Sequence, residues 1–102
     1  MANESDAAAV IKLAKPVMAH GEEVTELRFR APTGKDLIEL GNPVSVNVYA
    51  DDPIQTVKVD WTIMGRMMSR LAGVPLSTIE ALPPNVLTRA ATELSPAFFP
   101  VS

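Results

Sequence analysis

Apolar and polar residues alternate along two stretches near the start of the chain. The first, residues 11–17, places aliphatic side chains between lysines, and the second, residues 23–30, puts Leu27 and Phe29 on one face and charged side chains on the other. A glycine-containing segment, residues 18–22, separates them. Two alternating runs around such a turn predict a β-hairpin with one face toward solvent.

A short helix is predicted next, over residues 36–40. Thr33 stands three residues before Asp36, which is the spacing of a capping box. Gly41 follows the apolar residues and is suited to end the helix.

A second hairpin is predicted from the alternation of valines with polar residues over residues 44–49 and 56–59. The intervening Asp51-Asp52-Pro53 has the residue types of a turn. Because its apolar side is thin, this hairpin is interpreted as an extension or lid on the main core.

The clearest helical periodicity runs from Trp61 to Ala72, with Asp60 as N-cap and Gly73 as the stop. Its apolar residues cover roughly half of the helix surface, more than the ~100° stripe that one contact needs. They are Trp61, Ile63, Met64, Met67, Met68, Leu71 and Ala72. Two interpretations stay open, a core face or an adaptable, methionine-rich surface for a protein partner.

Two further helices are predicted, followed by an aromatic tail. Ser77 to Glu80 has the pattern of a capping box, which predicts a helix over residues 77–82. An apolar stripe predicts the last helix, over residues 84–94. The tail contains Phe98 and Phe99, which either enter the core or anchor in a partner.

The predicted fold class is therefore α+β: an N-terminal β-hairpin, a short helix, a second β-hairpin, then three C-terminal helices. A chain of 102 residues with 47% apolar residues suffices for one small core. We expect a flexible lead-in at residues 1–9 and a single domain over residues 10–102.

Composition argues against several classes of function. The chain has no cysteine, which excludes thiolate chemistry and cysteine-based metal sites, and no apolar run approaches the ~20 residues of a membrane span. Its one histidine, His20, lies near Glu22 and Glu23, and a solvated turn histidine is favoured over a metal ligand. With no nucleotide-binding or catalytic motif, we expect no enzyme activity, no cofactor and no metal.

A small DNA-binding regulator is a further possibility. Arg66, Arg70 and Arg89 lie on polar helix faces, and a helix, a glycine turn and a second helix could form a helix-turn-helix. The net charge of −3 argues against it, because nucleic-acid binding needs a concentrated positive field.

Several segments resemble the Mu-like and P2-like phage tail assembly proteins, the tail assembly chaperones. In the first half these are Lys15–Val17, Gly21–Leu27 and Arg30–Leu37; in the second they are Leu71–Ile79, Leu82 and Phe98-Phe99. The resemblance covers roughly residues 11–99, and residues 44–59 carry little of it.

The resemblance implies a protein that binds the tape-measure protein, and possibly the tail tube protein, in the cytoplasm of the bacterial host. It would keep the tape measure soluble during tube assembly and be absent from the mature virion. Self-association into a homo-oligomer and a role as a structural tail component, an adaptor or terminator, are the alternatives. The residues expected to contact a partner are Trp61, Met64, Met67, Met68, Leu71, Phe98 and Phe99.

Overall fold

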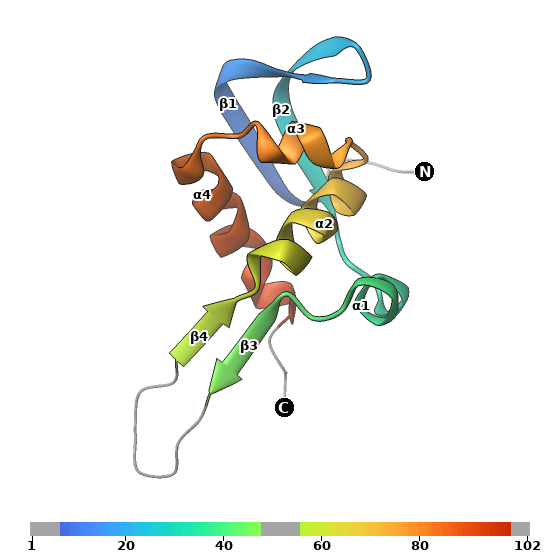
Figure 1. Ribbon diagram of the computed structural model, residues 1–102, viewed down its shortest axis with the longest axis vertical. Helices are drawn as coiled ribbons and strands as arrows, with labels where there is room; N and C mark the ends of the chain where they lie inside the picture. Colours follow the sequence, from blue (N-terminus) through green and yellow to red (C-terminus); the bar gives the residue numbers. More distant parts are fainter. Residues whose placement is uncertain (1–6, 48–55, 99–102) are drawn as a thin grey trace.

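The computed structural model describes residues 7–47 and 56–98 (Figure 1). In chain order its elements are β1 (Ala7–Ala19), β2 (Glu22–Arg30), α1 (Gly34–Leu40), β3 (Val44–Asn47), β4 (Thr56–Val59), α2 (Trp61–Ala72), α3 (Leu76–Glu80), α4 (Pro84–Leu94) and the 3₁₀ turn η2 (Ser95–Phe98). This order confirms the predicted α+β fold. Strand β1 takes in residues 7–9, which were assigned to the lead-in, and residues 1–6 lie outside the described part.

The elements form a helical layer on a two-stranded sheet. Figure 1 shows α2, α3 and α4 on one side of the β1–β2 hairpin, with α1 beside α2. The β3–β4 hairpin projects from the end of the body where α2 begins. The second hairpin is therefore an extension, as its thin apolar side predicted.

The turn between β1 and β2 contains only two residues, His20 and Gly21. Both have positive φ, 54° and 79°, and Ala19 pairs with Glu22 across them. This is the geometry of the two-residue hairpin turn that matches the twist of its strands, and it explains the glycine. The His20 Nε2 lies 3.2 Å from the carbonyl oxygen of Gly73. Because a carbonyl only accepts, Nε2 carries the proton, and this bond ties the hairpin turn to the end of α2.

Proline is accommodated in β1 by a bulge. Lys12 pairs with Glu26 and Val17 with Val24, so residues 13–16 stand opposite a single residue of β2. Pro16 lies within this unpaired stretch, where its missing N–H costs no ladder hydrogen bond.

The ends of α2 confirm the predicted caps. The Asp60 carboxylate accepts a hydrogen bond from the Ile63 N–H at 3.2 Å. Gly73 has φ +68°, a left-handed conformation that glycine adopts without a steric penalty. The capping box of α1, formed by Thr33 and Asp36, is also present.

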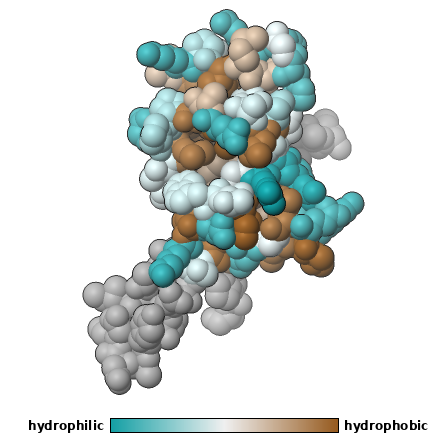
Figure 2. Space-filling view, viewed as in Figure 1, coloured by the Kyte–Doolittle hydropathy of each residue, from teal (hydrophilic) through white to brown (hydrophobic). Residues whose placement is uncertain are grey.

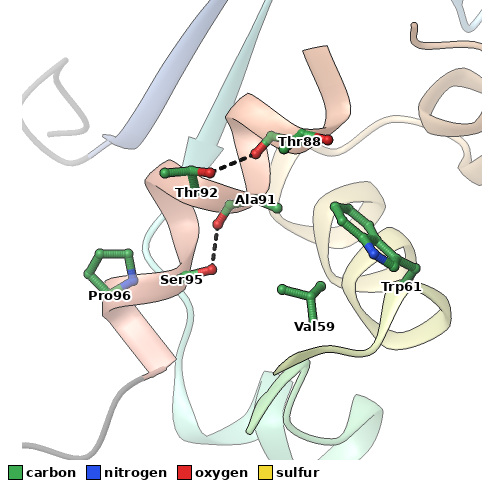
Figure 3. Close-up of a pocket in the computed structure, with 7 residues that line it drawn as sticks. All are labelled: Val59, Trp61, Thr88, Ala91, Thr92, Ser95 and Pro96. Carbon is green, nitrogen blue, oxygen red and sulfur yellow. Dashed lines mark hydrogen bonds between the residues drawn. The ribbon is translucent and has the colours of Figure 1, made fainter. Parts of the chain in front are cut away.

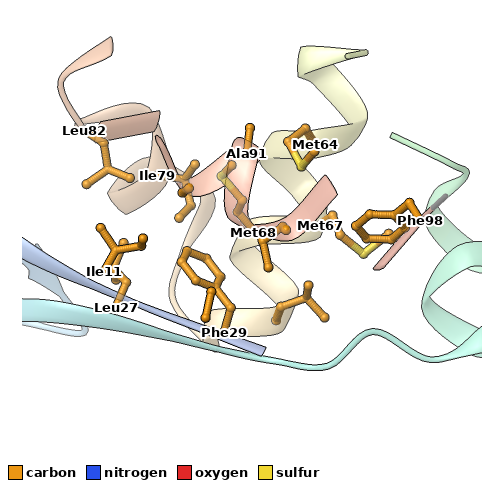
Figure 4. Packing of buried hydrophobic residues seen from close by; sticks show 14 of the residues in the cluster. Ile11, Leu27, Phe29, Met64, Met67, Met68, Ile79, Leu82, Ala91 and Phe98 are labelled. Atoms are coloured by element: carbon orange, nitrogen blue, oxygen red, sulfur yellow. The ribbon is translucent and has the colours of Figure 1, made fainter. Parts of the chain in front are cut away.

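The core lies between the hairpin and the helices (Figure 4). Phe29, Ile11 and Leu27 extend from the sheet toward Met68 and its neighbours on α2, and α3 and α4 close the sides. The fully buried α2 residues are Met64, Met67 and Met68, with 0% exposure each. The broad apolar arc of α2 is therefore covered from several directions within one protomer.

The base of the second hairpin joins this core. Val44 is buried and Val59 packs against the core from its rim. The Asp60 N–H donates to the Pro43 carbonyl oxygen at 2.8 Å, which fixes the hairpin to the start of α2. The turn predicted at residues 51–53 lies outside the described residues.

The predicted capping box of α3 was wrong. The helix begins at Leu76, with Pro75 in the N-cap position and no side-chain cap, so Ser77 lies inside the helix. The hydroxyl of Thr78 instead donates to the Met18 carbonyl oxygen of β1, at 2.6 Å. The start of α3 is thus connected to β1 by a tertiary hydrogen bond and has no side-chain cap. The helix ends at Glu80, two residues before its predicted end.

Helix α4 has the predicted bounds, and its apolar stripe faces the core through Ala90, Ala91 and Leu94. The chain then continues as η2 where a tail was expected. Phe98, at 8% exposure, closes the end of the core near Met67 (Figure 4).

Candidate partner-binding surface

Trp61, the first residue of α2, is the largest side chain that the core leaves on the surface. Its exposed fraction is 46%, in contrast to the buried methionines on the following turns of the same helix. An exposed tryptophan is typical of binding surfaces, because its ring offers a large apolar area at a low cost in conformational entropy.

An apolar hollow of about 350 Å³ adjoins this ring (Figure 3). Trp61 and Val59 form one wall, and α4 and η2 form the other. The lining residues are Val59, Trp61, Thr88, Ala91, Thr92, Ser95 and Pro96. Its volume lies at the lower end of the range for small binding pockets, so it has room for one or two side chains.

Two hydroxyl groups at this hollow form hydrogen bonds with backbone carbonyl oxygens of α4. The Thr92 hydroxyl donates to the Thr88 carbonyl oxygen at 2.9 Å, and the Ser95 hydroxyl donates to the Ala91 carbonyl oxygen at 2.6 Å (Figure 3). Both donors are thereby used within α4 and its extension. The hollow therefore presents mainly carbon atoms, in spite of its polar residue types.

A second hollow, of about 410 Å³, lies on the other side of Trp61. It is formed by α2, α3 and α4, and its lining residues are Trp61, Thr62, Gly65, Arg66, Leu76, Ile79, Glu80 and Leu87. Arg66 and Glu80 give it charges of both signs. We call the two hollows together the Trp61 groove.

The structure places most residues of the predicted binding face in the core. Met64, Met67, Met68, Leu71 and Phe98 are core residues in this fold, between 0% and 8% exposed. Of the predicted set, Trp61 lies on the surface, and Phe99 lies outside the described residues. The physical reason is that the apolar arc of α2 is too broad for one neighbour to cover. The β1–β2 hairpin, α3, α4 and η2 bury it together.

The remaining groove residues were missed in the sequence. Thr88 and Thr92 are exposed on α4 and do not belong to its apolar stripe. Their spacing of four residues, continued by Ser95, is a stripe of small side chains, and this signal could have indicated a close approach of another element.

The two most exposed of the large apolar side chains in the described residues lie apart from the groove. Ile38 on α1 is 87% exposed and Met18 on β1 is 56% exposed. In Figure 2 apolar patches on the visible face are separated by polar residues. The groove is distinguished from them by its concave shape.

A buried carboxylate holds α1 against the body. Asp36 accepts hydrogen bonds from the Arg30 guanidinium at 2.7 and 3.0 Å and from the Thr33 N–H at 2.8 Å. These bonds, that from Arg30 above all, lower the pKa of Asp36 well below its usual range. Arg70 of α2 lies 3.4 Å from the same carboxylate and also pairs with Glu39. This cluster is a structural connection between β2, α1 and α2.

The arginines that suggested DNA binding have acidic neighbours. Arg70 pairs with Asp36 and Glu39, and Arg89 lies 3.5 Å from Glu93 on the next turn of α4. Arg66 shares the second hollow with Glu80. The described helices therefore present no concentrated positive face for a phosphate backbone.

Two searches of the described residues concern other kinds of site. In the ranges 7–47 and 56–98, no helix has both the length and the apolar character of a membrane span. The same ranges contain no group of three or more acidic, histidine or cysteine side chains placed to hold a metal ion.

A small α+β domain with an apolar groove beside an exposed tryptophan is suited to binding other proteins. Residues 10–98 match the family described as phage tail assembly chaperone proteins, E, or 41 or 14, and the chain belongs to this family. Comparisons with curated proteins and with solved structures give no match. Membership assigns the protein to bacteriophage tail assembly, with a partner among the tail proteins.

Proposed function

We propose that this protein binds the tape-measure protein in the cytoplasm of the bacterial host and keeps it soluble until the tail tube assembles around it. It acts by binding alone, without an enzymatic step, a cofactor or nucleic acid, and it is absent from the mature virion. The family supports the general role, and the exposed Trp61 beside an apolar hollow is the observation that carries the binding proposal.

The physical mechanism is reversible burial of apolar surface. A tape-measure chain that waits for tube subunits exposes apolar helix faces, which favour aggregation. Covering them contributes about 25 cal/mol per Å² of apolar area, from which the costs of association are subtracted. A modest groove therefore gives a contact that tube subunits can displace.

Co-expression with the tape-measure protein of the same phage tests the proposal. The fraction of tape-measure protein in the supernatant should be higher with the wild-type chain or with Ile38→Lys than without this chain. With Trp61→Lys it should be lower than with the wild-type chain. Ile38 is the matched control because it is apolar and even more exposed, but lies outside the groove. Lysine at Met64 or Met68 would be uninformative, since a charge at a fully buried position disrupts the fold itself.

Equal solubility with and without the wild-type chain would contradict the proposal. Mass spectrometry of purified particles tests the proposal that this chain is absent from the mature virion. Stoichiometric presence of this chain in mature virions would support a structural tail component instead.

A further inference from the structure

We propose that the Trp61 groove accepts one amphipathic helix, which places two uncharged apolar side chains, four residues apart, in the two hollows on either side of Trp61. This inference rests on the proposed function, because it takes the helix to be a segment of the tape-measure protein. It adds the chemistry and the spacing by which a segment would be recognised.

The spacing follows from the register of α4, which borders both hollows. Leu87 lines the second hollow, and Ala91, one turn later, lines the first. Four residues of an α-helix span about 6 Å along the axis. A partner helix lying along α4 therefore reaches both hollows with residues i and i+4, which share one face.

The chemistry follows from the lining of the first hollow. Among the described residues no charged side chain lines it, and the hydroxyls of Thr92 and Ser95 already donate to carbonyl oxygens of α4. A charged side chain entering there would lose its water and gain no opposite charge from the described lining residues, and a polar one would find only a few hydroxyl groups. The residue that fits is aliphatic or aromatic, in contact with the indole of Trp61.

A helix fits this groove better than an extended peptide. The walls are mainly the side chains of α2, α3 and α4, whose backbone groups are bonded within their own helices. Among the described lining residues, an extended segment would find a strand to pair with only at Val59, the last residue of β4, whereas a helix satisfies its own backbone hydrogen bonds.

The size of the groove argues against a second copy of this chain as the occupant. A stable contact between two globular proteins buries about 800 Å² on each partner. Hollows of about 350 and 410 Å³ accommodate a few side chains, which suits a single helix with two anchors.

Dye-labelled, 20-residue peptides that tile the tape-measure protein of the same phage are the probe, with fluorescence anisotropy as the readout. Peptides that bind should contain an apolar i, i+4 pair, and glutamine at either position should weaken binding at least tenfold. Thr92→Lys in the first hollow and Thr62→Lys in the second should each weaken binding at least tenfold. Thr25→Lys, the same change at an exposed position of β2, is the control and should have no effect. Circular dichroism verifies that each variant is folded.

Three results would overturn the inference. The first is a set of binding peptides whose apolar pairs are spaced i, i+2, as an extended chain requires. The second is equal binding by the Thr92, Thr62 and Thr25 variants. The third is that no peptide binds while the full-length tape-measure protein is still kept soluble. In that case the proposed function stands, and the groove is not its site. Self-association that Thr92→Lys abolishes would then assign the groove to a second copy of this chain.

Discussion

The guanidinium of Arg30 and the carboxylate of Asp36 are joined by two hydrogen bonds, although the carboxylate is almost completely buried and the guanidinium is about half exposed. This pair connects the end of β2 to α1. Leu37 and Ile38 are on the surface and Leu40 packs only partly buried against the core, so the polar connection contributes much to the position of α1.

Replacing the buried carboxylate should therefore destabilise the domain. Asp36→Asn keeps the shape but removes the charge, and the expected loss is about 2 kcal/mol, discounted for the solvent exposure of Arg30. Chemical denaturation measures it, with Glu39→Gln as the control on the same helix. Equal losses in the two variants would contradict the special role of Asp36.

The same residue predicts a dependence of stability on pH. Because the pKa of Asp36 is lower in the folded protein than in the unfolded chain, its contribution is fully present above the unfolded value of about 3.9. It is lost as the pH falls from there through the folded value. Denaturation midpoints between pH 6 and pH 2 should fall more steeply for the wild type than for Asp36→Asn, whereas parallel curves would exclude this assignment.

Substitutions at Thr78 and Ser77 compare two interactions that could stabilise the start of α3, a tertiary hydrogen bond and a local helix cap. The buried Thr78 hydroxyl donates to the Met18 carbonyl oxygen, so Thr78→Val should cost about 1–2 kcal/mol. Ser77 is exposed and caps nothing, so Ser77→Ala should change the free energy of unfolding by less than about 0.5 kcal/mol. A capping role for Ser77 would reverse this order.

Two glycines of α2 should respond in opposite directions to alanine. Gly65 is helical, and an added Cβ would meet only ordinary contact with Leu76 at 3.8 Å, so Gly65→Ala should stabilise by about 0.5–1 kcal/mol. Gly73→Ala should destabilise by about 1 kcal/mol, because φ of +68° is unfavourable for alanine. Thermal unfolding of both variants checks the signs, and the same sign for both would be inconsistent with these backbone conformations.

Much of the fold could be predicted because its signals are local. The caps at Asp60 and Gly73 act within their own helix, and the alternation that places Leu27 and Phe29 inside needs no knowledge of the partner layer. The predicted α3 cap is absent because the helix begins at Leu76 with Pro75 as N-cap, and the tertiary bond of Thr78 to a carbonyl oxygen sixty residues earlier has no local signal.

Which residues of α2 are exposed was harder to predict, for a related reason. A helical wheel shows that the apolar arc of α2 is broad, but it cannot show how many neighbours cover it. Met64 and Met68 are covered and Trp61 is not, because Trp61 stands at the first turn, where α2 leaves the second hairpin. The hollows exist only once α4 packs beside this turn, and no pattern within α2 contains that information.

The most direct measurement of the central claim uses Trp61 as its own reporter. It is the chain's one tryptophan, so labelling this chain with 5-fluorotryptophan gives one ¹⁹F resonance from the groove, which an unlabelled partner does not obscure. Adding the tape-measure protein should shift this resonance and remove its sensitivity to exchange of H₂O for D₂O, because the ring becomes buried. A complex in which the resonance keeps its position and its solvent sensitivity would show that the partner binds elsewhere.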